Sequence, residues 1–190
     1  LRTSGINTAK DLNNKVIAVG GLNNIVDLAT RAWMDKNGGD SQTVKIVEIP
    51  ISQMGEAVIS GRVAGANMVR SSYPTLDKPG DPVHIIAYTY DAIGPYFIQG
   101  GWFSTSDWIA KHPAESREFA SIMADTSRWA AKHPHDVVTY LAKYLNNDPA
   151  ELEATPREVF GTELTPKLVQ PPIDTAAKYH FIPATFASTE

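Results

Sequence analysis

The chain has 190 residues, of which 43% are hydrophobic and 20% are charged, so it can bury a packed core, and its composition excludes disordered and fibrous proteins. Its formal net charge of -4 at pH 7 excludes the broad basic surface with which proteins attract nucleic acids or anionic membranes. Because cysteine is absent, disulfides, thiolate metal sites and cysteine nucleophiles are excluded as well.

The first third of the chain alternates between predicted strands and predicted helices. Runs of apolar and β-branched residues predict strands at 16–19, 44–49 and 63–69. Apolar residues at helical spacing predict a helix from Ile25 to the glycine pair at 38–39, and a second, short helix capped by Ser52. This order favours a mainly parallel sheet with right-handed crossovers, as in α/β proteins.

The remaining sequence changes from predicted strands to predicted helices. Residues 73–82 have the composition of an exposed loop, and we expect strands at 84–90 and 96–104 with a turn between them. Proline and capping signals then predict helices at about 113–133, from 137, from 148, from 155 and at about 173–179. The sequence thus predicts an α/β fold followed by a helical C-terminal region.

The glycine turn after the first predicted strand is the most informative motif. It consists of Gly20, Gly21, Leu22, Asn23 and Asn24, and it leads directly into a helix. Glycines after a strand allow the backbone to approach a ligand, and the amides at a helix N-terminus can bind a carboxylate, sulfonate or phosphate. In the alternative interpretation, Asn23 or Asn24 caps the helix and nothing is bound.

Two further groups of residues are candidates for ligand binding. Arg70, Ser71 and Ser72 follow the third predicted strand, so we expect them at the same carboxyl edge of the sheet as the glycine turn, unless they only begin a solvated loop. Thr89 and Trp102 could line a small-molecule pocket. The alternative for Trp102, and the more common one, is a position in the core.

Residues that would carry catalysis or bind a metal show no recognisable pattern. The five histidines are scattered or flank a proline, the serines follow no nucleophile motif, and the paired carboxylates belong to helix caps. We therefore expect no catalytic residue, no metal and no cofactor, and we interpret the chain as a binding protein and not as an enzyme.

Five segments spread over nearly the whole chain carry a resemblance to a known family. They are Asp11-Leu-Asn-Asn-Lys-Val-Ile-Ala-Val-Gly-Gly21, Gly61-Arg-Val-Ala-Gly-Ala66, Gly100-Gly-Trp-Phe-Ser-Thr-Ser-Asp-Trp108, Arg128-Trp-Ala130 and Gln170-Pro-Pro-Ile-Asp-Thr-Ala-Ala-Lys-Tyr179. Together they resemble the NMT1/THI5-like solute-binding proteins, a branch of the type II periplasmic binding proteins that includes binders of sulfonates, taurine, nitrate and pyrimidine precursors.

The resemblance implies two α/β lobes that are joined by crossing strands and close on a ligand. Residues 1–98 are then expected to form the second lobe, and residues 99–190 a crossing strand and the mostly helical return segment of the first lobe, so that the chain is a piece of a longer protein. Many relatives have an acidic residue where this chain has Ala64-Gly65, which changes the cleft side of the third predicted strand.

The function implied by the resemblance is that of the solute-binding component of an ABC importer. Such a protein is expected to be a periplasmic monomer whose partners are a small-molecule ligand and the membrane permease, with no role for nucleic acid. Helix-end amides and Arg70 favour an organic acid as the ligand, and the resemblance adds sulfonates and pyrimidine-like solutes. The main alternative is the effector domain of a LysR-type transcription regulator, which shares this lobe architecture and would follow a helix-turn-helix segment.

Overall fold

The computed structural model describes residues 1–69, 79–153 and 159–189. The chain forms two compact units, one made of Leu1–Phe97 and Pro166–Glu190 and the other of Ile98–Thr165. Among the described residues, no helix is both long and apolar enough to cross a lipid bilayer. The expected division at residue 98 into parts of two lobes stays a prediction.

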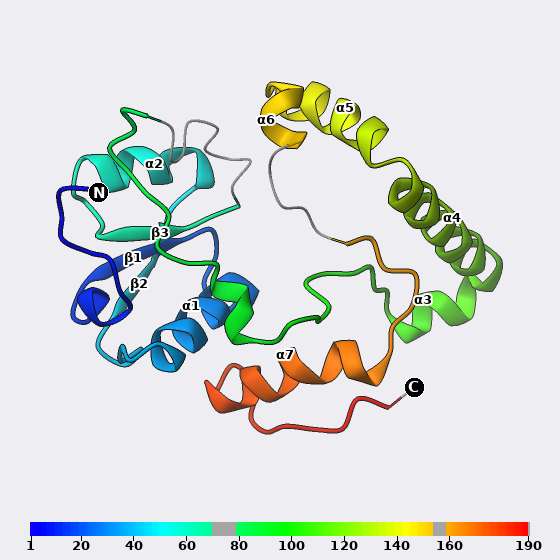
Figure 1. The fold of residues 1–190 in the computed structure, drawn as a ribbon. Coiled ribbons are helices and arrows are strands. Elements are labelled where there is room, and N and C mark those ends of the chain that lie inside the picture. The colour runs from blue at the N-terminus through cyan, green and yellow to red at the C-terminus, as the bar shows by residue number, and fades with distance from the viewer. Residues whose placement is uncertain (70–78, 154–158, 190) are drawn as a thin grey trace. The chain divides into compact units, whose positions relative to one another are not determined.

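A parallel sheet of three described strands forms the centre of the first unit (Figure 1). The strands are β1 (Val16–Val19), β2 (Lys45–Glu48) and β3 (Gly65–Asn67), and their order in the sheet is β2-β1-β3. Val19, the last residue of β1, pairs with the last residue of each neighbour. The predicted α/β fold and its parallel strands are confirmed, with β2 and β3 shorter than predicted.

Two helices cover the two faces of this sheet (Figure 1). Helix α1 (Ile25–Lys36) packs on one face, where Ile17 and Met34 belong to one buried cluster, and α2 (Ile51–Ile59) packs on the other face, where Ala18 and Met54 belong to a second cluster. Successive residues of a strand point to opposite faces, which explains why neighbouring residues of β1 belong to different clusters. Each fully buried Ile or Met side chain contributes about 1.5–3 kcal/mol.

The predicted cap of α2 is wrong. Ser52 lies inside the first turn, and the N-cap residue is Pro50, whose side chain offers no hydrogen bond. Because proline fixes φ near the value observed here, -53°, and its ψ is extended at 135°, Pro50 provides the non-helical residue that precedes the helix.

The strands predicted at 84–90 and 96–104 are also wrong. Neither segment pairs with the described sheet, and Thr89–Ala92 forms a short 3-10 helix, η3, that packs against α1. The Lys36 ammonium at the end of α1 donates a hydrogen bond to the Asp91 carbonyl at 2.9 Å. Aromatic and β-branched residues fit any half-buried surface, and here contacts with α1 override their preference for a strand.

Helix α7 (Pro166–Lys178) belongs to the first unit and contacts α1. It begins well before the predicted start at 173 and contains two prolines, at 171–172, which supply no backbone N–H donor but do not end the helix. After the helix, the Tyr179 hydroxyl donates to the Asp35 carboxylate of α1 at 2.9 Å. Packing and this hydrogen bond together fix α7 to α1.

The second unit consists of consecutive helices: α3 (Ser106–Lys111), α4 (Pro113–Lys132), α5 (Pro134–Leu145) and α6 (Pro149–Glu153). The predicted helices from about 113, 137 and 148 are confirmed, and the start predicted at 155 lies outside the described residues. His112 and His133 each precede a proline, which disfavours a helical conformation in the preceding residue, so that one helix ends and the next begins.

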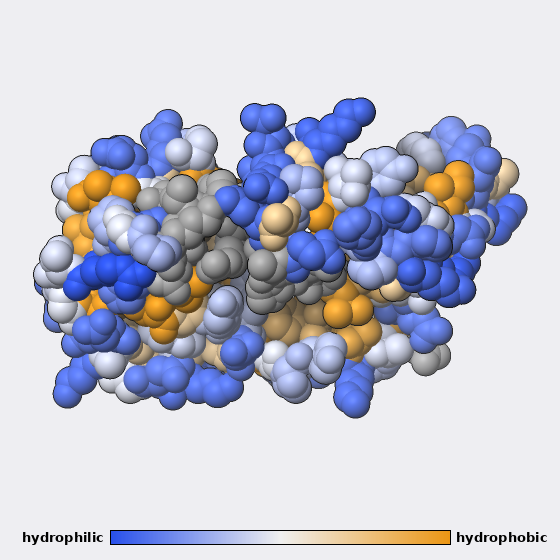
Figure 2. All heavy atoms as spheres, turned by 45° about the horizontal axis from the view of Figure 1, so that its top comes forward, coloured by the Kyte–Doolittle hydropathy of each residue, from blue (hydrophilic) through white to orange (hydrophobic). Residues whose placement is uncertain are grey.

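Few side chains are buried within the second unit. Its described core contains Val138, Ala142 and Leu152, and the Phe103 side chain is 98% exposed. Apolar side chains therefore reach the surface of the protein among the hydrophilic ones, as Figure 2 shows.

Candidate functional site

The strand order makes one edge of the sheet the candidate place for a ligand. Because β2 and β3 lie on opposite sides of β1, the connection from β1 to β2 runs to one side of β1 and the connection from β2 to β3 crosses to the other side. Ligands of open α/β sheets bind at such switch points. Val19 and Asn67 are paired there, so the glycine turn and the end of β3 leave the sheet next to each other. We call Gly20–Asn24, Asn67 and Thr89 the switch-point rim.

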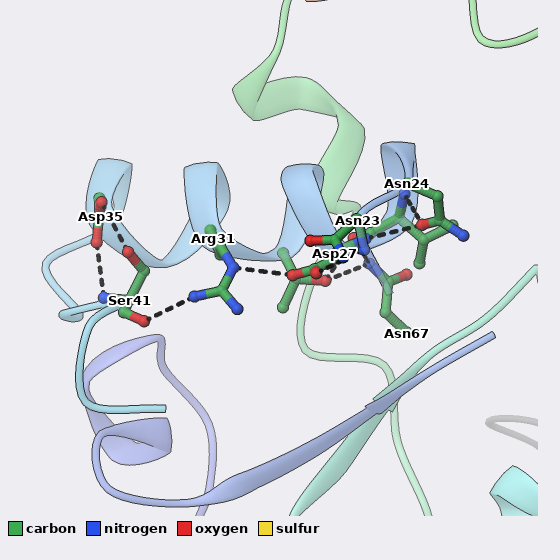
Figure 3. A network of polar contacts seen from close by, with 9 residues as sticks. Asn23, Asn24, Asp27, Arg31, Asp35, Ser41 and Asn67 are labelled. Carbon is green, nitrogen blue, oxygen red and sulfur yellow. Dashed lines mark hydrogen bonds and ion pairs between the residues drawn. The ribbon is translucent and has the colours of Figure 1, made fainter. Parts of the chain in front are cut away.

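The glycine turn is held by its own side chains. The Asn24 carboxamide oxygen accepts hydrogen bonds from the amides of Val26 at 2.9 Å and Asp27 at 3.2 Å, and thereby caps α1 (Figure 3). A Cβ atom on Gly21 would lie 2.7 Å from Asn24 Nδ2, so a larger residue would collide with the cap. The predicted strand, turn and helix are present, with Asn24 as the capping residue.

Two carboxylates occupy further amides of the turn. Asp27 is only 2% exposed, and it accepts a hydrogen bond from the Asn23 amide at 3.1 Å. The exposed Glu48 at the end of β2 accepts a weaker bond from the Leu22 amide at 3.4 Å. An anion at this turn would therefore compete with acceptors and negative charge that the protein already supplies. The ligand-binding role of Gly20–Asn24 stays a prediction.

A chain of polar contacts continues from Asp27 along α1 (Figure 3). Arg31 donates from Nε to Asp27 Oδ1 at 2.9 Å and from Nη1 to the Ser41 carbonyl at 3.4 Å. The Ser41 amide and hydroxyl in turn donate to the Asp35 carboxylate. Arg31 therefore neutralises the charge of Asp27 and uses its Nε and Nη1 atoms in bonds within the protein.

Hydrogen bonds shift the pKa values at the far end of this chain. Partial burial opposes ionisation of Asp35, but the bonds that it receives from the Ser41 amide, the Tyr179 hydroxyl and the Ser41 hydroxyl hold its pKa below the ordinary value. Burial, followed by the bond to the Asp35 carboxylate, raises the pKa of Tyr179 far above its ordinary value. The hydrogen bond between them thus favours the charged form of Asp35 and the neutral form of Tyr179.

Asn67 is a rim residue that the sequence interpretation did not single out. Its side-chain NH2 group donates to the hydroxyls of Thr30 at 2.8 Å and Thr89 at 2.9 Å, and it lies 3.4 Å from the Val26 carbonyl oxygen. Asn67 therefore joins the end of β3 to the first turns of α1 and to η3. The sequence signal was a polar residue at the end of an apolar strand, which is a weak signal when taken alone.

The other predicted ligand-binding residues have different outcomes. Thr89 lies at the start of η3 and contacts Asn67, so it is brought to the rim although its predicted strand is absent. Arg70, Ser71 and Ser72 lie outside the described residues. Trp102 belongs to the second unit, is 74% exposed, and makes an edge-on ring contact with Phe119 at 5.9 Å, so it is not a core residue of that unit.

A hollow of about 400 Å³ lies at the opposite, amino edge of the sheet. It is lined by Leu1, Ser4, Ile6, Asn14, Lys15, Val16, Gly61, Arg62, Val63 and Ala64. Ligands of open α/β sheets bind at the carboxyl edge, so the topology of the strands favours the switch point over this hollow. In the described part of the chain, no group of three or more His, Asp or Glu side chains is arranged to hold a metal ion.

Comparisons with known proteins give a family and a fold. The structure is similar to that of the alkanesulfonate-binding protein SsuA from Xanthomonas axonopodis pv. citri, solved with bound MOPS, with a TM-score of 0.73 at 16% sequence identity. The similarity covers 93% of this chain but only 61% of that protein, so the chain spans less than two thirds of its length. No curated protein matches by sequence. The NMT1/THI5-like family model matches residues 1–137, and the chain therefore belongs to the NMT1/THI5-like family.

Proposed function

We propose that this chain is part of the solute-binding component of an ABC importer and that it captures a small organic solute without reacting on it. Membership of the NMT1/THI5-like family and the fold that the chain shares with an alkanesulfonate-binding protein support this proposal. The structural observation that carries it is the switch-point rim, where the ends of β1 and β3 bring Asn67 next to the glycine turn.

The chemistry of the rim suits binding better than catalysis. The described polar side chains of the rim are amides and a hydroxyl, and the neighbouring carboxylates of Asp27 and Glu48 already accept hydrogen bonds from the turn. Amides and hydroxyls orient a solute through hydrogen bonds, whereas general acid or base catalysis needs a group that can exchange a proton near neutral pH. Membership of the family supports a further part of the proposal, that the protein is a periplasmic monomer that delivers its solute to a membrane permease.

Closure of two lobes on the solute would allow the permease to distinguish loaded from empty protein. Small-angle scattering of the whole natural protein tests this step. We expect the radius of gyration to decrease when the solute saturates the protein, and an unchanged radius at saturation would contradict closure.

A thermal-shift screen tests the binding function itself. The whole natural protein is heated with sulfonates, aromatic and aliphatic carboxylates, pyrimidines and amines, because a solute that binds only the folded state stabilises it by about 2.7 kcal/mol at 100 times its Kd. We expect at least one organic solute to raise the melting temperature. The absence of any shift would contradict solute binding, and shifts caused only by amines would contradict the predicted preference for acids.

The segment that precedes this chain in the natural protein distinguishes import from regulation. A signal peptide upstream supports the importer, whereas a helix-turn-helix upstream supports the LysR-type alternative.

A further inference from the structure

We propose that Asn67 and Thr89 form the polar recognition element of the solute site and that they select a solute with an N–H group beside a C=O group, as in a lactam or a cyclic imide. In this arrangement the Asn67 carboxamide oxygen accepts a hydrogen bond from the solute and the Thr89 hydroxyl donates one. The inference rests on the proposed solute-binding function, adds the two residues, and replaces the acid expected from the sequence with a solute whose recognised edge is uncharged.

The hydrogen bonds around Thr30 determine which way the Asn67 carboxamide points. The single hydroxyl proton of the buried Thr30 is donated to the Val26 carbonyl at 2.7 Å, so the Thr30 oxygen can only accept from Asn67. A reversed carboxamide would place its oxygen against two acceptors, the Thr30 hydroxyl and the Val26 carbonyl. The NH2 group of Asn67 must therefore face α1.

The same carboxamide determines the direction of the Thr89 hydroxyl. The second amide proton of Asn67 is donated to Thr89 Oγ1 at 2.9 Å, so this oxygen serves as an acceptor and its own proton points elsewhere. No acceptor for that proton is found among the described residues. The rim thus contains a hydroxyl donor whose proton points away from Asn67.

The carboxamide oxygen of Asn67 is the matching acceptor. No described residue donates a hydrogen bond to it, and it is not among the enclosed polar atoms that lack a partner, so solvent reaches it. Both residues are half-buried, so each keeps part of its surface exposed to solvent. A donor and an acceptor on two side chains that are hydrogen-bonded to each other match the edge of a lactam or imide, which offers one of each.

The charge of the rim agrees with an uncharged polar edge at this position. Glu48 and Asp27 place carboxylates at the neighbouring turn, and the guanidinium of Arg31 is paired with Asp27. A sulfonate offers acceptors only, so it would satisfy the Thr89 donor and leave its oxygens facing the Asn67 oxygen. Sites that hydrogen-bond a solute discriminate strongly against analogues that lack the matching group.

Isothermal titration calorimetry of the whole natural protein with succinimide and N-methylsuccinimide tests the proposed class. The two probes differ only at the N–H group, and 1-propanesulfonate serves as the acceptor-only comparison. We expect succinimide to bind at least about tenfold more tightly than the other two. Equal affinities of succinimide and N-methylsuccinimide, or tighter binding of 1-propanesulfonate, would overturn the inference.

Variants test the two residues separately. Thr89→Val removes the donor and Asn67→Leu removes the acceptor, and each is expected to weaken succinimide binding at least about tenfold, whereas Thr139→Val on the surface of α5 is the matched control. Asn67→Asp replaces the NH2 group with an acceptor, so Thr89 would donate to it and the preference for succinimide over N-methylsuccinimide should disappear.

The melting temperature of each variant separates lost binding from lost folding. Thr89→Val keeps the shape of the side chain, so this variant remains informative even if Asn67→Leu unfolds. Unchanged succinimide affinity in folded Thr89→Val would overturn the inference while the solute-binding function stands. If neither these probes nor any solute in the thermal-shift screen binds the unmodified protein, the proposed function itself fails.

Discussion

Replacement of Asn24 with alanine separates a structural role of the glycine turn from a ligand-binding role. The Asn24 carboxamide accepts bonds from the amides of Val26 at 2.9 Å and Asp27 at 3.2 Å, and alanine provides no acceptor for either amide. Loss of such a cap costs about 0.5–2 kcal/mol. Because Asn24 is exposed, water can reach the freed amides, and we expect a loss of about 1 kcal/mol. For a chain of this size, that lowers the melting temperature by about 2–4 °C.

Differential scanning calorimetry of Asn24→Ala and Asn24→Asp provides the assay. Aspartate keeps the acceptor, and its charge favours a helix N-terminus by about 0.3–1 kcal/mol, but the neighbouring carboxylates of Asp27 and Glu48 offset that gain. The melting temperature of Asn24→Asp should therefore stay close to that of the unmodified protein. If Asn24→Ala melts at the unmodified temperature but loses solute affinity, Asn24 is a ligand contact and the reasoning above is refuted.

Three further predictions concern the first unit. Asn23 has a φ of 56°, so Asn23→Gly should leave stability unchanged and Asn23→Val should cost about 1–2 kcal/mol in urea unfolding; equal stabilities would contradict the strain argument. Met34 is fully buried, so Met34→Ala should cost about 2–5 kcal/mol and Met34→Leu less than about 1.5 kcal/mol, and similar losses would show that the cluster tolerates a cavity. Tyr179→Phe removes the hydrogen bond to the Asp35 carboxylate and should lower the melting temperature at pH 7. The lowered pKa of Asp35 means that the stabilisation from this carboxylate is present above the ordinary carboxyl pKa and is lost as the pH falls below about 4. The raised pKa of Tyr179 adds a stabilisation that is present below about pH 10 and is lost above it, so a melting-temperature difference between the two proteins that stayed constant from pH 3 to pH 11 would contradict both shifts.

The parallel sheet could be predicted because local sequence and tertiary packing agree there. Residues 16–19 are apolar throughout, as expected for a strand between two helices, and the glycines after this strand predict a turn whether or not a ligand binds there. The segments at 84–90 and 96–104 have a similar composition, but neither pairs with a strand of the described sheet. At the end of the first segment, packing of η3 on α1 takes the place of strand pairing. Composition alone does not contain that tertiary contact.

Asn67 shows why the candidate site was predicted only in part. The sequence identified the glycine turn through its neighbours in the chain, and capping by Asn24 follows from local spacing. The contact between Asn67 and Thr89 joins residues that are 22 positions apart in sequence, and it depends on strand order and on the unpredicted η3. The sequence therefore identified Thr89 but placed it in a strand instead of in η3, and Asn67 became recognisable as a rim residue only in the folded chain.

Chemical-shift mapping by NMR tests most directly that the solute binds at the switch-point rim. The isotope-labelled natural protein is titrated with the solute that gives the largest thermal shift, and the backbone amides of Gly20 and Gly21 and the side-chain NH2 group of Asn67 are followed. We predict that these signals shift on saturation while Gly61, beside the hollow at the amino edge, does not. Shifts at Gly61 with unchanged signals from Gly20, Gly21 and Asn67 would contradict the proposed site.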